Sequence, residues 1–412
     1  MPPMPVVPAT LRWRVCGAHL VIWLMTNAQL VQAPLDNGSR TKLALTAGIT
    51  MLFSVGVFIA SQLGSMPAGF GTIVVLIGMG IVLKLAWTIS SKSASSAERA
   101  RFALLMSNVG LIIATLSALA ALPRLTKAAG VGLFTVDLAA QLWTVGLLFA
   151  AAGPARTLGW RALLGAFLLG FLGLMGLARF VGRPVIVALG NTSLFAAAIW
   201  VPITEEIFKL LPLAFMLFFA LRRSDSRPSL VDMVLLTGCA AAGFAVSENA
   251  SYGRGVFSLT AAPLVSLLSP ATNRGAAYGW SMVQTGHLLH SALIALAIGL
   301  VVLYRGRLPR WIARAWMVPA VAVGAVLLEH CSQNAIVTGG LNRYVGEFCM
   351  IVTLGGRLCA LLLALGVGYV MTIEWRAFTP LSPSKEWLVL SPQEASRRAG
   401  WLALLQVRGP HA

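Results

Sequence analysis

Long apolar runs separated by short polar connectors occupy most of the chain. A helix needs about 20 apolar residues to cross the hydrocarbon core of a bilayer, and the runs approach or exceed that length. They cover residues 43–63, 70–89, 102–122, 131–153, 161–178, 193–221, 231–250, 280–304, 315–334 and 350–372. Because a backbone in lipid must satisfy its own hydrogen bonds, the pattern predicts an all-α polytopic membrane protein with about ten transmembrane helices.

An earlier apolar segment, residues 15–33, is compatible with three structures. Arg12 and Arg14 precede it and small residues end it, as in a signal peptide with a cleavage site. Asn27 and Gln29 interrupt the segment, which weakens it as a membrane span. It is therefore interpreted as a signal peptide, a span or an interfacial helix.

The composition excludes a sizeable soluble domain, since 58% of the 412 residues are apolar and only 11% are charged. The net charge of +18 does not indicate nucleic-acid binding, because the arginines are scattered through short loops instead of forming one patch. The basic loops 222–232 and 305–314 are expected on the cytoplasmic side, together with the C-terminus. No cysteine belongs to a CxxC pair, and all are expected to be packing residues: Cys16, Cys239, Cys331, Cys349 and Cys359.

The distribution of charge divides the chain into three parts. Residues 1–183 form an N-terminal transmembrane block of unknown role, in which Lys84 and Asp137 are isolated charges that can snorkel to the membrane surface or pair with one another. Residues 184–373 form a transmembrane core that holds every cluster of acidic residues and histidines. Residues 374–412 are a cytoplasmic tail whose last part can form an amphipathic helix on the membrane surface.

The first of these clusters contains Glu205, Glu206 and Lys209. Ionisable groups inside a membrane are costly, so that a functional role is their default interpretation. On a helix the ammonium of Lys209, three or four residues away, can reach either carboxylate. It keeps one carboxylate ionised while the other can hold a proton, which is what a general base for water requires. A self-neutralising ion pair with a packing role is the alternative.

The second cluster contains Glu248, Asn249 and Tyr252 at the end of a helix rich in Gly and Ala. These small residues permit close approach of a neighbouring helix. Glu248 and Tyr252 lie four residues apart and share a helix face. A glutamate held there can orient a histidine or bind a metal ion, and a polar helix end at the membrane interface is the alternative.

Two further clusters contain histidines. His287 and Ser291 share one helix face, with His290 beside them. His330 and Asn334 lie one helical turn apart, so that an imidazole and a carboxamide can both donate to an oxyanion. A hydrogen bond between helices, without catalysis, is the simpler interpretation of each histidine taken alone.

The order and spacing of the four clusters resemble the PrsW family of bacterial intramembrane proteases, which is grouped with the CAAX prenyl proteases. The resemblance rests on EEIFK at 205–209, GFAVSENASY at 243–252, HLLHSALIALAIG at 287–299 and HCSQN at 330–334. These runs are similar to the family's EExxK and ENxxY motifs, its histidine followed four residues later by Ser or Thr, and its HxxxN or HxxxD motif. The resemblance covers roughly residues 193–335.

What the resemblance implies is hydrolysis of peptide bonds in membrane-anchored protein substrates, by a multi-pass protein of the bacterial inner membrane. Glu205 or Glu206 would activate a water molecule, with Lys209 holding the pair in place. His287 and His330 would bind the water or polarise the carbonyl. Asn334 would complete the oxyanion hole and Glu248 would orient a histidine. Supporting roles are implied for Asn249, Tyr252 and Ser291.

The need for a metal ion is left open by the sequence. The family is described both as metalloproteases and as metal-free glutamate proteases. His287, His330 and Glu248 make a possible three-ligand zinc site with one open position, although the chain contains no HExxH motif. The same residues can also act without a cofactor, by a general base and an oxyanion hole.

Two other functions compete with proteolysis. A proton-coupled transporter can use the same intramembrane Glu, His and Lys groups, and an inactive scaffold can retain the helices. In a protease the catalytic groups must converge on one point, whereas in a proton relay they follow a path across the membrane. Val283 stands where the CAAX proteases have a phenylalanine, so that prenylated substrates are not expected.

Overall fold

The computed structural model describes residues 36–62, 68–90, 95–152, 158–220, 229–252, 286–304 and 316–378. Throughout these ranges the chain is helical and contains no β-strand, which confirms the predicted all-α class. Four predicted features lie wholly or largely outside the described residues: the segment 15–33, the basic loops 222–232 and 305–314, and the amphipathic helix near the C-terminus.

The described residues form a series of helices. In chain order they are α2 (Asp36–Gln62), α3 (Ala68–Ser90), α4 (Ser96–Ala129), α5 (Val131–Ala152), α6 (Trp160–Leu168), the π-helical turn η4 (Leu169–Leu174), α7 (Met175–Leu189), the π-helical turn η5 (Leu194–Trp200), α8 (Val201–Lys209), α9 (Leu211–Ala220), α10 (Leu230–Tyr252), α12 (Gly286–Tyr304), α14 (Met317–Thr338), α15 (Gly340–Val352) and α16 (Leu358–Phe378).

Six of the described helical stretches are long and apolar enough to cross a membrane, and they make the chain a multi-pass membrane protein. They lie in α3, α4, the continuous unit α6–η4–α7, α10, α12 and α14, whereas α2, α5 and α16 contain shorter apolar stretches. The predicted count of about ten spans is therefore not confirmed, although each predicted run overlaps a helix. Helix α7 runs without a break through the predicted domain boundary at residues 183 and 184.

Two predicted spans are divided, and one of them, 350–372, is shared between α15 and α16. The run 193–221 was expected to form a single helix, but it forms η5, α8 and α9, with a break at Leu210. Pro212 explains the break, because it lacks the N–H that would bond to the carbonyl of Phe208. The short helix α8, only nine residues long, can therefore take a direction of its own inside the protein.

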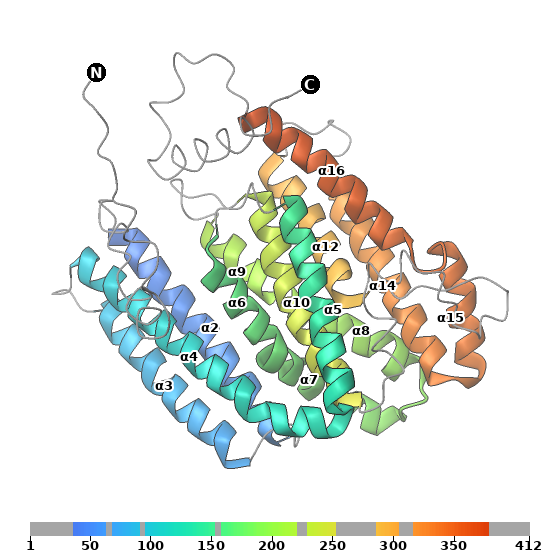
Figure 1. Cartoon of the computed structure of the whole chain (residues 1–412), viewed down its shortest axis with the longest axis horizontal. Helices are drawn as coiled ribbons and strands as arrows, with labels where there is room; N and C mark the ends of the chain where they lie inside the picture. The colour runs from blue at the N-terminus through green and yellow to red at the C-terminus, as the bar shows by residue number, and fades with distance from the viewer. Residues whose placement is uncertain are drawn as a thin grey trace.

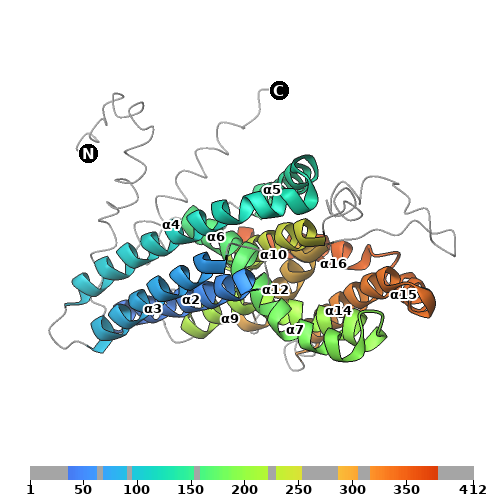
Figure 2. The same ribbon diagram turned by 90° about the horizontal axis from the view of Figure 1, so that it is seen from below.

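Helix α10 lies at the centre of the molecule (Figure 1). It packs against α5, α6, η4 and α12, and 94% of its most apolar 18-residue stretch is buried inside the protein. Helices α2, α3 and α4 form a layer on one side, while α14, α15 and α16 lie on the other side of the centre (Figures 1 and 2). In α3 and in α4 only 22% of the corresponding stretch is buried, as expected for helices with a wide lipid-facing surface.

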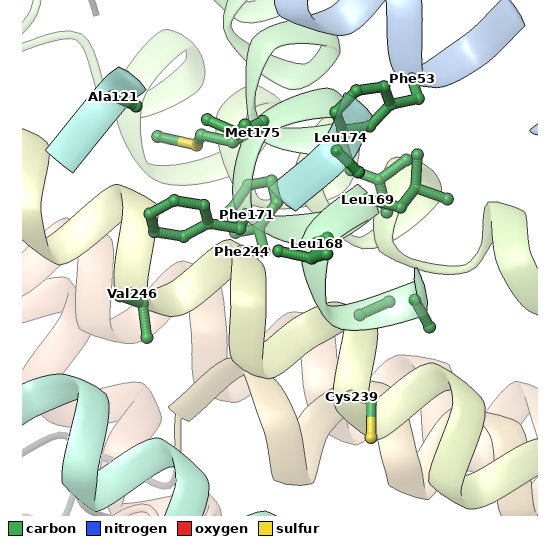
Figure 3. Close-up of a cluster of buried hydrophobic side chains, with 14 of the residues drawn as sticks. Phe53, Ala121, Leu168, Leu169, Phe171, Leu174, Met175, Cys239, Phe244 and Val246 are labelled. Carbon is green, nitrogen blue, oxygen red and sulfur yellow. The ribbon is translucent and has the colours of Figure 1, made fainter. Parts of the chain in front are cut away.

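The packing of α10 against α6 and η4 depends on small residues. Figure 3 shows Phe244 of α10 among Leu168, Phe171 and Met175 in the buried apolar cluster. A side chain at Gly243 would collide with the backbone of Phe167, so that only glycine permits this approach. The close contact predicted from the run of Gly and Ala is therefore present, and it sets the position of the last turns of α10.

Candidate active site

Side chains from four helices meet beside the last turns of α10 and form what we call the Glu–His cluster. Its members are Glu205, Glu206 and Lys209 of α8, Glu248 of α10, His287 of α12 and His330 of α14. All are buried except His287, whose side chain is 14% exposed. The groups singled out in the sequence for their spacing thus lie together, although they are up to 125 residues apart in the chain.

Lys209 is the cation of the cluster and is completely buried. Its Nζ lies 2.6 Å from Oε1 of Glu206, the partner three residues earlier on the same helix. It also lies 2.7 Å from Nδ1 of His287 and 5.1 Å from the centre of the Phe244 ring. The ammonium therefore joins α8 to α12 and faces an aromatic ring of α10.

Glu206 has hydrogen-bond partners on both of its oxygens. Its Oε1 faces Lys209 and also lies 3.0 Å from Nδ1 of His330, while its Oε2 accepts a hydrogen bond of 3.1 Å from the hydroxyl of Ser291. An ammonium, an imidazole and a hydroxyl surround a carboxylate that is almost inaccessible to water. These contacts make Glu206 a connecting residue among α8, α12 and α14.

The tautomer of His287 follows from its two neighbours. A lysine ammonium can only donate, so that Nδ1 of His287 accepts from Lys209. The remaining ring proton must then be on Nε2, which contacts the carboxylate of Glu248. This contact orients the imidazole, in the way that a carboxylate commonly orients a histidine in a metal or catalytic site.

Glu205 is held less firmly than Glu206. Its Oε2 lies 3.4 Å from Nε2 of His330 and has no hydrogen-bond partner among the described residues. If Nδ1 of His330 donates to Glu206, Nε2 has a lone pair, and two acceptors face one another at that distance. Such a pair needs a shared proton, a cation or the hydrogens of a water molecule.

The donor set is suitable for a divalent metal ion. Ligand atoms of Glu205, His287 and His330 all lie within 4.8 Å of one another, and this combination of one carboxylate and two imidazoles is typical of catalytic zinc. With neutral imidazoles, the three carboxylates and the one ammonium of the Glu–His cluster sum to a charge of −2, which a divalent ion would neutralise. The structure groups Glu205 with the two histidines, whereas the sequence analysis had named Glu248.

Two other residues named from the sequence make hydrogen bonds beside the cluster. The Nδ2 of Asn334 donates to the carbonyl of Ala197 in η5 at 3.1 Å, and the Nδ2 of Asn249 donates to Oδ1 of Asp137 at 3.0 Å. The side chain of Tyr252 lies outside the described residues.

Asp137 is a site neighbour that sequence reasoning missed. Pairing with Lys84 was one of two alternatives for Asp137, but Lys84 lies over the ring of Trp87, and Asp137 is buried beside Asn249. The two partners are separated by 112 residues, and no local spacing indicates their contact. Through Asn249, helix α5 of the N-terminal block reaches the residue next to Glu248.

Residues 158–356 match the family model described as PrsW family intramembrane metalloprotease. The match begins before the motifs do and includes α6, η4 and α7, and it contains all six members of the Glu–His cluster. A search of the curated proteins and a search of the solved structures each found no significant match.

Proposed function

Because this chain belongs to the PrsW family of intramembrane peptidases through residues 158–356, we propose that it cleaves membrane-anchored proteins with a water molecule activated at the Glu–His cluster. Family membership supports the peptidase activity and the membrane location. The roles of individual residues in the reaction are our proposal.

The convergence of the cluster is the observation that carries the proposal. Four helices contribute titratable side chains that contact one another directly, instead of spacing them along the length of a helix bundle. Hydrolysis requires a base, a water and a polarised carbonyl at one point, whereas a proton relay requires separate stations across the membrane. The contact geometry therefore favours the peptidase and gives no support to the transporter.

Glu205 is the better candidate for the general base. Both oxygens of Glu206 are engaged by Lys209, His330 and Ser291, while Oε2 of Glu205 has no hydrogen-bond partner among the described residues. A water molecule that donates one hydrogen to Glu205 and one to Nε2 of His330 would satisfy both acceptors. Its oxygen would then be free to attack the carbonyl carbon, with Glu205 taking the proton and passing it to the leaving amine.

The other residues of the cluster hold this pair in position. Glu206 fixes His330 and Lys209, and Glu248 fixes the ring of His287. Asn334 lies one turn beyond His330, and the N–H of its carboxamide that is not bonded to Ala197 can donate to the developing oxyanion. A divalent ion, if bound, would be held by Glu205, His287 and His330 and would polarise the attacking water.

The test compares the N-termini of membrane proteins in cells that express the wild type or Glu205→Gln at matched abundance. A matched control is Glu347→Gln, because Glu347 is an equally buried glutamate that pairs with Arg343, away from the cluster. We expect new termini in or beside membrane spans with the wild type and the control, and their loss with Glu205→Gln. Identical termini in all three, from correctly inserted proteins, would refute the proposed activity in those cells.

A further inference from the structure

A second group of buried polar side chains lies beside the Glu–His cluster and is not used by the proposed mechanism. We call it the second polar cluster: His290 of α12, Glu329 of α14 and Cys359 of α16. Their relative exposures are 1%, 0% and 0%, so that water has no access to them. The rings of His290 and His330 are 5.7 Å apart, which makes the two clusters neighbours with different members.

The side chains of the second polar cluster have the chemistry and spacing of metal ligands. Nε2 of His290 lies 3.1 Å from Oε1 of Glu329, and ligand atoms of all three residues lie within 4.8 Å of one another. Cysteine, histidine and glutamate are all zinc ligands. A cysteine in the set disfavours magnesium, calcium and manganese, which prefer oxygen ligands.

An unsatisfied oxygen provides a second, independent observation. Oε2 of Glu329 is fully buried and has no hydrogen-bond partner among the described residues. A buried carboxylate oxygen without a partner is costly, and a cation bound to it would remove that cost. The same carboxylate is one of the three candidate metal ligands.

The charge balance also agrees with a bound divalent ion. The cluster contains one carboxylate and one thiol beside an imidazole, deep in the protein. If zinc binds and the thiol releases its proton to solvent, one thiolate, one carboxylate and one Zn²⁺ sum to zero. A neutral site is the least costly arrangement of ions inside a membrane protein.

We propose that His290, Glu329 and Cys359 form a second metal site that binds zinc and ties α16 to α12 and α14. Cys359 lies beyond residue 356, where the family match ends, so that the site joins the matched region to the helix that follows it. Because the three ligands come from three helices and are sealed from water, an ion bound there would hold these helices together and would not meet a substrate.

Cobalt replaces zinc in a spectroscopic test on the full-length protein purified in detergent. A bond between Co²⁺ and a cysteine thiolate produces a charge-transfer absorption that histidine and carboxylate ligands do not produce. We expect this absorption in the wild type, its loss in Cys359→Ser, and the loss of one bound zinc per chain in the same variant. Cys239→Ser is the matched control, since Cys239 is buried on α10 outside the cluster, and it should keep the absorption.

Two further variants separate this site from the Glu–His cluster. Glu205→Gln with His287→Ala removes two of the three ligands there and should keep the cobalt–thiolate absorption, while Glu329→Gln should weaken it. Absence of the absorption in the wild type, or its persistence in Cys359→Ser, would overturn the proposal. Neither result depends on proteolytic activity, so that the proposed function is tested separately.

Discussion

The Glu–His cluster and the second polar cluster share helices α12 and α14 but differ in their access to water. In the first, the side chains of His287 and Glu248 are 14% and 10% exposed. In the second, the paired side chains of His290 and Glu329 are 1% and 0% exposed. Hydrolysis needs water and a substrate, so that only the first cluster is suited to catalysis, and the sealed cluster is suited to holding helices together.

The clusters also differ in how their carboxylates are neutralised. Glu206 has the ammonium of Lys209 at 2.6 Å, a cation supplied by the chain itself. Glu329 has an imidazole and a thiol as neighbours, and neither carries a permanent positive charge. The chain itself therefore supplies a cation for Glu206, whereas Glu329 would obtain one from a bound metal ion.

The largest effect is expected from Glu206→Ala, which removes the partner of a fully buried lysine. Breaking a buried ion pair leaves a charge without compensation and costs about 3–5 kcal/mol. Cleavage should also be lost, because His330 and Lys209 are no longer held. The free energy of unfolding of the detergent-purified protein and the appearance of new N-termini measure the two effects.

Glu347→Ala is the control for that stability loss. Glu347 is also buried, but its partner Arg343 is 44% exposed and can turn to solvent. We therefore expect a loss of about 1 kcal/mol or less. Equal losses in Glu206→Ala and Glu347→Ala would show that burial of the glutamate alone, and not the buried lysine, determines the cost.

Glu205→Gln should separate activity from stability. Loss of a general base slows proton transfer by about 10²–10⁴-fold. The free energy of unfolding should change much less than in Glu206→Ala, because the glutamine has nearly the same shape and its amide can donate to Nε2 of His330, 3.4 Å from Oε2 of Glu205. Measurements of the cleavage rate and of the free energy of unfolding on the same protein sample check this. A variant that cleaves at the wild-type rate would assign the base to another residue.

Some contacts of this site can be predicted from the spacing of residues along the chain, and others cannot. The contact between Lys209 and Glu206 follows from three-residue spacing on a helix, and the helices themselves follow from apolar runs. The unequal surroundings of Glu205 and Glu206 depend on α12 and α14, so that nothing in EEIFK indicates them. The break at Leu210 had a signal in Pro212, which the length of the apolar run obscured.

Zinc should stabilise the protein by binding to the second polar cluster. In a Glu205→Gln background, zinc at about 100 times its Kd should raise the free energy of unfolding by about 2.7 kcal/mol. The additional substitution Cys359→Ser should abolish this increase, because the thiolate ligand is lost. Thermal unfolding with and without zinc measures the increase, and an undiminished one in the double variant would place the zinc elsewhere.

The smallest effect tests whether the N-terminal block supports the Glu–His cluster. Asp137 of α5 accepts from Asn249, whose neighbour Glu248 contacts His287. Asp137→Ala and Asn249→Ala should each slow cleavage by an amount equivalent to about 1 kcal/mol, the usual contribution of one hydrogen bond. The double variant should be no slower than the slower single variant, because both changes remove the same bond. Lys84→Ala, on α3 beside Trp87, should combine additively with Asn249→Ala. Additive losses for Asp137→Ala and Asn249→Ala would mean that α5 does not act through this contact.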